Sequence, residues 1–121
     1  MAELKDLIGK TLATVVRNGE TELVFVTNDG RRYKLHHEQD CCESVTIDSI
    51  VGDLDDLVGE PLLLAEESTS GIHPAGYAAK GDEESFTWTF YKFATRKGYV
   101  DVRWIGESNG YYSESVDFTD A

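Results

Sequence analysis

The stretch 86–104, FTWTFYKFATRKGYVDVRW, decides the fold of this chain. Two runs rich in aromatic and β-branched residues flank the turn signal RKG at 96–98. Such residues favour strands, and a glycine within a short polar break favours the tight turn of a hairpin. We therefore predict two antiparallel strands, at 85–95 and 99–106.

The first of these strands carries aromatic side chains on both of its faces. Strand alternation puts Phe86, Trp88 and Phe90 on one face and Tyr91 and Phe93 on the other. Large apolar residues on both faces are typical of a central strand, so we expect burial on both sides. On the second strand Val102 and Trp104 share a face, with Arg103 opposite.

Two meanders account for most of the predicted sheet. The turn signals RNG (17–19) and NDG (28–30) separate strands at 12–17, 23–27 and 31–36. A strand at 111–118, after the turn SNG (108–110), completes a second meander with 85–95 and 99–106. A helical turn at 4–8 is expected to pack its apolar side over a sheet edge.

The segment between the meanders has a mixed pattern. Val45 and Ile47 predict a brief extended segment, after which 48–59 reads as a helix with Asp48 as its N-cap and Gly59 at its end. Its apolar face would comprise Ile50, Leu54, Leu57 and Val58. A strand at 60–67 follows. The stretch 68–84 is rich in small residues and exceeds ordinary connection lengths, so we expect a mobile loop.

These elements predict an α+β fold for the chain. We expect one domain spanning 1–121, with a mostly antiparallel, strongly curved sheet of six to seven strands in two meanders and one or two short helices. The βαβ rhythm of a parallel sheet is missing, and so are the Rossmann and P-loop fingerprints. The pattern therefore argues against the common nucleotide-binding folds.

The N-terminus and the hydropathy pattern favour a cytoplasmic protein. The start, MAELKDLIGK, lacks the apolar core of a signal peptide, and no apolar run approaches the roughly 20 residues of a membrane span. The two cysteines, Cys41 and Cys42, are adjacent, so they cannot close an ordinary disulfide loop, and we expect two reduced thiols.

Charge is distributed very unevenly along the chain. The chain has 23 acids and 11 bases, yet no lysine or arginine occurs between Lys34 and Lys80. That interval holds ten acids: Glu38, Asp40, Glu43, Asp48, Asp53, Asp55, Asp56, Glu60, Glu66 and Glu67. Direct binding to nucleic acid is disfavoured, because it depends on lysine and arginine displacing counterions. A protein partner with a basic face is favoured, although an acidic surface that only aids solubility is the simpler alternative.

Two groups of residues are candidates for contact with such a partner. The first is the acidic group at the predicted helix, Asp53, Asp55, Asp56 and Glu60. The second is the pair Tyr111 and Tyr112, which follows a tight turn, because interfaces favour tyrosine, tryptophan and arginine. Core packing is the alternative role for the tyrosines.

A metal site is an alternative hypothesis. The block HHEQDCCES supplies nitrogen, oxygen and sulfur donors from His36, His37, Asp40, Cys41 and Cys42. A structural zinc site draws ligands from two separated pairs, and a second pair is missing here, so a structural role for the block is favoured over zinc. The acids at 53–56 lack the residue order of a calcium-binding EF-hand.

Catalysis has weaker support in the sequence. A cysteine–histidine pair could be assembled from Cys41 or Cys42 with a histidine, but no flanking signature accompanies it. A small enzyme or nucleotide-binding protein with a site near Arg103, Asn109 and Tyr111 is a third hypothesis. No cofactor is predicted.

Four motifs carry a resemblance to a known family. They are the HxxxDCCE block (His36 or His37, with Asp40 to Glu43), the GDLxDL block at 52–57, TWTFY at 87–91 and SNGYYS at 108–113. In these the chain resembles a family of small uncharacterised proteins from bacteriophage, prophage and bacterial genomes, many from phages of actinobacteria. The resemblance covers about 36–118 and implies a phage origin. Small acidic phage proteins often occupy surfaces of host proteins, sometimes by imitating the charge of DNA.

The leading hypothesis joins the charge pattern to this resemblance. We expect a non-catalytic phage accessory protein that works in the host cytoplasm during infection or lysogeny. It would bind a host protein through an acidic surface, in host takeover or against host defence.

Overall fold

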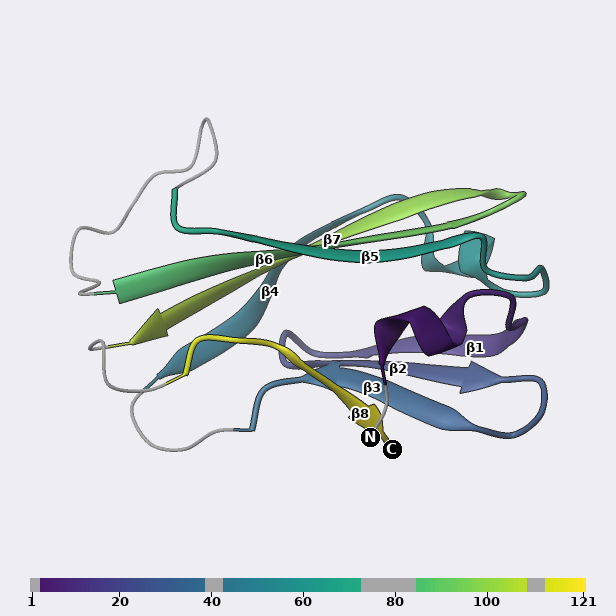
Figure 1. The fold of residues 1–121 in the computed structure, drawn as a ribbon, viewed down its shortest axis with the longest axis horizontal. Helices are drawn as coiled ribbons and strands as arrows, with labels where there is room; N and C mark the ends of the chain where they lie inside the picture. Colours follow the sequence, from purple (N-terminus) through teal and green to yellow (C-terminus); the bar gives the residue numbers. More distant parts are fainter. Residues whose placement is uncertain (1–2, 39–42, 73–84, 109–112) are drawn as a thin grey trace.

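Two antiparallel sheets of four strands face each other as the layers of a sandwich (Figure 1). The computed structural model describes residues 3–38, 43–72, 85–108 and 113–121. The first sheet has the order β1 (Leu12–Asn18), β2 (Glu22–Thr27), β3 (Arg32–His36) and β8 (Asp117–Asp120). The second has the order β4 (Ser44–Val51), β7 (Gly98–Ser108), β6 (Ser85–Thr95) and β5 (Leu64–Ser70).

The helix content is lower than the α+β prediction requires. In the described ranges the helices are two single 3₁₀ turns, η1 (Leu4–Leu7) and η2 (Leu54–Leu57). The predicted strongly curved sheet is instead two open sheets, and the described strands number eight rather than six or seven. The antiparallel pairing itself is confirmed. The described part of the chain contains no helix with the length and hydrophobicity of a membrane span.

The helix predicted at 48–59 is wrong, and Gly52 shows why. Its φ of +106° ends strand β4, and a Cβ atom there would lie 2.6 Å from the carbonyl oxygen of Tyr99. An α-helix cannot pass through that backbone conformation, which favours glycine. The helical part that remains begins after Asp53, whose side chain accepts a hydrogen bond from the Asp55 N–H at 3.0 Å. Asp53, and not Asp48, is therefore the N-cap.

Strand β5 begins and ends later than predicted. It runs from Leu64 to Ser70 where 60–67 was expected, so the predicted mobile loop at 68–84 begins with strand residues. Residues 73–84 of that loop lie outside the described ranges. The preceding Leu62 is buried, and its backbone bonds both to Gly9 and to Lys10, which fixes β5 beside the η1 region. The prediction that the helical turn at 4–8 packs over a sheet edge is confirmed, since η1 contacts the edge strand β5.

The first meander is confirmed, but the second loses its third strand. β6 and β7 pair along their whole length, with Trp88 opposite Ile105. The segment predicted at 111–118 yields only β8, which pairs with β3 in the other sheet, with Phe118 opposite Leu35. The second neighbour of β7 is β4 instead. The chain therefore crosses between the sheets after β7.

The crossing is fixed by a close approach between Gly106 and Glu114. A Cβ at Gly106 would overlap the Glu114 carbonyl oxygen and lie 2.8 Å from the Glu114 Cβ. The Glu114 carboxylate accepts hydrogen bonds from Thr87 Oγ1 at 2.8 Å and from Ser108 Oγ. Burial raises the pKa of Glu114, but hydrogen bonds from Ser108, Ser85 and Thr87 outweigh it and hold that pKa below its ordinary value. The carboxylate thus belongs to the packing of β6 and β7.

Apolar side chains from both sheets fill the space between them. Phe25 of β2 meets Phe93 of β6 with ring centroids 5.4 Å apart, and Tyr33 stacks on Phe118 at 5.3 Å. Trp104 is fully buried in this core. Burial of each large side chain contributes about 1.5–3 kcal/mol. The contact between Phe25 and Phe93 joins the two layers, whereas Tyr33 and Phe118 stack within the first sheet.

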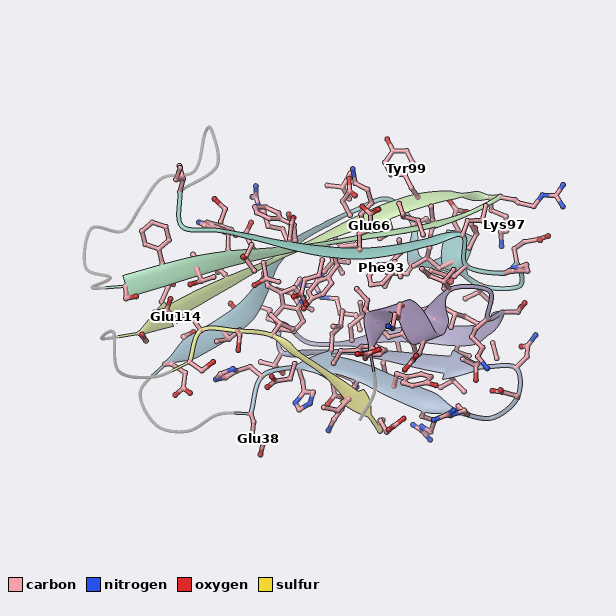
Figure 2. The ribbon with its side chains drawn as sticks, in the orientation of Figure 1. Glu38, Glu66, Phe93, Lys97, Tyr99 and Glu114 are labelled. Carbon is pink, nitrogen blue, oxygen red and sulfur yellow. The ribbon has the colours of Figure 1, made fainter. Side chains whose placement is uncertain are left out.

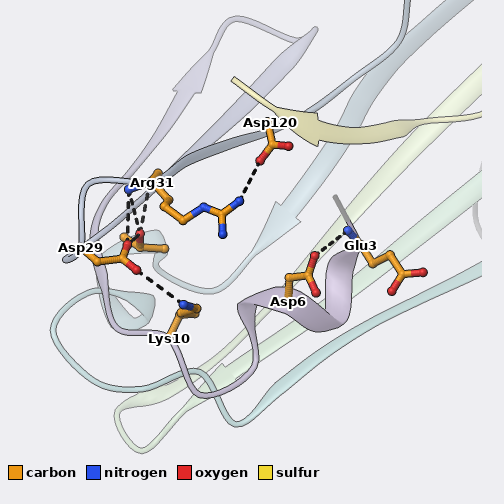
Figure 3. Close-up of polar contacts among 7 residues, drawn as sticks. Glu3, Asp6, Lys10, Asp29, Arg31 and Asp120 are labelled. Atoms are coloured by element: carbon orange, nitrogen blue, oxygen red, sulfur yellow. Dashed lines mark hydrogen bonds and ion pairs between the residues drawn. The ribbon is translucent and has the colours of Figure 1, made fainter. Parts of the chain in front are cut away.

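Charged pairs at the β2–β3 turn join the sheet to both ends of the described chain (Figure 3). Lys10 lies 3.5 Å from Asp29, and Arg31 lies 3.5 Å from Asp120 of β8. Hydrogen bonds from Thr27 and from the Arg31 backbone hold the pKa of Asp29 below its ordinary value. Because these pairs are exposed, each contributes little to stability, and their main effect is on geometry.

The crossing predicts the effect of one added methyl group. Gly106→Ala places a Cβ against the Glu114 backbone, so we expect a loss of about 2–3 kcal/mol in the free energy of unfolding, measured by chemical denaturation. Gly71→Ala is the matched control, because no atom lies within 4 Å of the added Cβ, and it should be nearly neutral. Equal stability of the two variants would contradict the crossing.

Candidate functional site

The face of the second sheet that points away from the core, here called the outer face, is organised in rows across the strands. Tyr91, Phe93, Val102 and Trp104 point into the core, so their neighbours in sequence point outward. Reading from β5 to β7, the pairing gives the rows Glu66–Lys92–Asp101, Ser68–Phe90–Arg103 and Ser70–Trp88–Ile105. Figure 2 shows Glu66 and Tyr99 on this outer side and Phe93 between the sheets.

Contacts between Trp88 and Arg103 restrict the conformations of the side chains at the centre of the outer face. Trp88 is fully buried although it points away from the core, and the Arg103 guanidinium lies 5.0 Å from the centre of its ring. Arg103 Nε also donates a hydrogen bond to Asp48 of β4 at 2.8 Å. A guanidinium held between an aromatic face and a carboxylate has few alternative conformations. The prediction of burial on both faces of β6 is therefore confirmed at Trp88, while Phe86 and Phe90 are only half-buried.

A groove crosses the outer face beside this centre. It has a volume of about 370 Å³ and is lined by Glu66, Glu67, Ser68, Phe90, Tyr91, Lys92 and Asp101. The Tyr91 hydroxyl donates to Glu67 at 2.7 Å, and burial, followed by this contact, raises the pKa of Tyr91. One carboxylate oxygen of Asp101 is buried and accepts no hydrogen bond from any described residue.

The acidic group predicted to bind a partner lies at η2, next to the β6–β7 hairpin. Asp53 and Asp55 are exposed, while Asp56 and Glu60 are half-exposed. No ion pair joins any of these four carboxylates to another described residue. Lys97 lies close by, but its ammonium donates to backbone carbonyls, those of Asp55 at 3.1 Å and Val58 at 2.9 Å.

The acids of the 38–67 interval are distributed over several surfaces. Glu43 is buried and paired, and Asp48 is paired with Arg103. Glu66 lies on the groove, and Asp53 with its neighbours lies at η2. Exposed Glu38 follows β3, so the described acids of the interval do not form a single face.

His37 of the metal hypothesis takes part in a buried ion pair. Its Nε2 lies 2.8 Å from Glu43 Oε2, and its Nδ1 lies 2.8 Å from the Ser115 carbonyl oxygen. Burial lowers the pKa of His37, but the hydrogen bonds to Glu43 and Ser115 and the Glu43 charge outweigh it, so the pKa is raised. Because both ring nitrogens face acceptors, the imidazolium form satisfies the site.

This geometry leaves little room for His37 as a metal ligand. Ligation would break one of its two hydrogen bonds, and Nε2 of the neighbouring His36 contacts Thr119 Oγ1 at 3.0 Å. Within the described ranges no group of three or more histidine, cysteine or acidic side chains is arranged to hold a metal. The other candidates, Asp40, Cys41 and Cys42, lie outside these ranges, so the zinc hypothesis stays a prediction.

The family follows from a comparison with sequence models of known families. The model for the domain of unknown function DUF7448 matches residues 5–118. The chain belongs to this family. No curated protein and no solved structure matches the chain. The DUF7448 match agrees with the expected uncharacterised family, and it carries no assignment of activity.

The sequence identified some parts of the candidate site of this DUF7448 chain and missed others. Arg103 was a candidate and lies at the centre of the outer face, whereas Asn109, Tyr111 and Tyr112 lie outside the described ranges. The groove was missed, because Glu66, Phe90 and Asp101 meet only through strand pairing. Alternation together with the register of the predicted hairpin could have placed Phe90 and Asp101 on one face.

The ion pair of this DUF7448 chain predicts a pH-dependent stability. The folded-state pKa of His37 is raised above its unfolded value of about 6.5, so the stabilisation is complete below pH 6.5. It is lost as the pH rises through the raised pKa. Denaturation between about pH 5.5 and pH 9 should therefore show wild type losing more stability on the alkaline side than His37→Gln does.

Two further variants make this test specific. Glu43→Gln should lower stability by about 1–3 kcal/mol at pH 6, because it replaces a buried charge-assisted hydrogen bond with a neutral one. Glu38→Gln removes an exposed acid next to His37 and should keep the wild-type pH dependence. A profile for His37→Gln parallel to that of wild type would show that the pair does not titrate with folding.

Proposed function

We propose that this protein is a small, non-catalytic, phage-encoded accessory protein that binds a host protein with a basic face. The observation that carries the proposal is the set of exposed or half-exposed carboxylates without a described cation partner, Asp53, Asp55, Asp56 and Glu60. The phage origin and the action in the host cytoplasm rest on the motif resemblance described above.

Electrostatics supports a basic partner. The formal net charge is −12, and ten acids without a base occur between Lys34 and Lys80. Where carboxylates are not internally paired, their field extends into solvent, raises the rate of encounter with a basic surface and disfavours acidic partners. The same sign of charge disfavours direct contact with nucleic acid.

The outer face supports a protein rather than a small ion as the partner. Tyr99 is 64% exposed and Val51 is 60% exposed, and both lie near the hairpin end of the second sheet. Interfaces combine such aromatic and aliphatic contacts with arginine and a polar rim, and Arg103 is already held rigidly nearby. Apolar burial would supply affinity, and the carboxylates would supply orientation.

A pull-down from host lysate tests the proposal. The variant Asp53→Asn, Asp55→Asn, Asp56→Asn removes three charges, and asparagine at position 53 still caps η2. We expect retention of the partner to fall about tenfold or more, and binding of wild type to weaken as salt is raised.

A charge-matched control accompanies this variant. Glu3→Gln, Glu20→Gln, Glu22→Gln also removes three surface charges, but from outside the acidic interval, and should retain the partner. Undiminished capture by the Asp→Asn variant, or equal losses in both variants, would reject an acidic contact surface at η2.

A further inference from the structure

The groove on the outer face has a floor of mixed charge. Glu66, Lys92 and Asp101 lie side by side on β5, β6 and β7, each directly opposite its neighbour in the strand pairing. Phe90, half-exposed, belongs to the next row and lines the same groove. At about 370 Å³ the groove is near the lower end of the range for ligand pockets, roughly 300–1,000 Å³.

Asp101 is the unusual member of this row. Its Oδ1 is buried and accepts no hydrogen bond within the described chain. Lys92 is directly opposite in the pairing, yet no ion pair joins the two side chains. A buried acceptor without a donor costs about 1–3 kcal/mol, and more when the group is charged. The Asp101 carboxylate also lines the groove, so its charge, which no described cation pairs with, acts on any group that enters there.

The net charge of the groove lining determines which charge an incoming donor should carry. Glu66 and Asp101 contribute two negative charges to the outer face of the groove, against one positive charge from Lys92, while the Glu67 carboxylate is on the core side, where it accepts a hydrogen bond from Tyr91. Arg103 does not offset them, because its guanidinium is held by Asp48 and Trp88. The groove therefore attracts a cation and repels a carboxylate or phosphate.

We propose that the groove receives one arginine side chain from the basic face of the partner, with its guanidinium at Asp101 and Glu66 and against Phe90. The guanidinium is planar, offers several donors to carboxylates and stacks on aromatic rings, which suits a site with acids beside an aromatic wall. The inference rests on the proposed function and adds the chemistry of the group recognised. It concerns the groove, and the carboxylates at η2 are a separate contact.

A small probe tests the groove directly. N-acetyl-arginine amide is titrated into the ¹⁵N-labelled full chain, with N-acetyl-citrulline amide as the uncharged analogue of the same shape. We expect the arginine probe to shift the amide signals of Glu66–Ser68, Phe90–Lys92 and Asp101, and the citrulline probe to leave them nearly unchanged. Equal shifts from both probes, or shifts confined to η2, would overturn the inference.

Variants with opposite expected effects make the titration decisive. Asp101→Asn should weaken binding of the arginine probe about tenfold, since it removes the charge of the buried acceptor. Lys92→Met should strengthen binding severalfold, because it removes a competing positive charge from the groove. Glu60→Gln removes one acid outside the groove and should change nothing. If neither Asp101→Asn nor Lys92→Met changes the affinity for the arginine probe, the inference is overturned. This holds whether or not Asp101→Asn alters stability.

The failure of this inference can be told from the failure of the proposed function. If the captured host protein is lost with the Asp53, Asp55 and Asp56 variant but kept with Asp101→Asn, the groove is not its arginine site, and the proposed function stands. If the η2 variant keeps the partner, the proposed function fails, whatever the probe titration shows.

Discussion

The contact between Glu114 and Gly106 is the constraint on which the rest of the structure depends. The chain leaves the second sheet after β7, passes against the bare backbone of Gly106 and enters the first sheet as β8. The Glu114 carboxylate accepts hydrogen bonds from Thr87 and Ser108, so the crossing is attached to both β6 and β7. Because the chain crosses over, the strand beside β7 at the sheet edge is β4, and this pairing brings Asp48 to Arg103.

The second sheet serves two purposes with one set of strands. Its inner face supplies Phe93 and Trp104 to the core, while its outer face carries the buried Trp88 and the groove. Binding groups are positioned more precisely on rigid strands than on loops. In this chain the same backbone hydrogen bonds that stabilise the sandwich also set the spacing of Glu66, Lys92 and Asp101.

Local patterns predicted those parts of the fold that local forces decide. Alternation put Val102 and Trp104 on one face of their strand, and both are buried, because side-chain direction in a strand has a period of two. The helix at 48–59 failed because apolar spacing does not show that Gly52 must take a positive φ beside Tyr99. The prediction of a third strand in the second meander was wrong because long-range packing, and not local sequence, determines which strand the segment pairs with.

The candidate site was less accessible to sequence reasoning than the fold. The charge asymmetry pointed to Asp53, Asp55 and Asp56 as exposed acids, but it gave no sign that Glu43 would be buried against His37. The groove depends on which strand lies beside which, and a sequence without strand pairing cannot supply that information. Arg103 was a candidate because it precedes the predicted turn with Asn109 and Tyr111, and because interfaces favour arginine and tyrosine.

The place of β5 at the end of its sheet has a consequence for the chain's own self-association. A strand at a sheet edge offers unpaired backbone groups to any other strand, including one from a second copy. On β5 the middle of that edge carries Glu66 and Glu67, so two copies that approached edge to edge in antiparallel fashion would bring like charges together. These like charges therefore disfavour antiparallel pairing between the β5 edges of two copies.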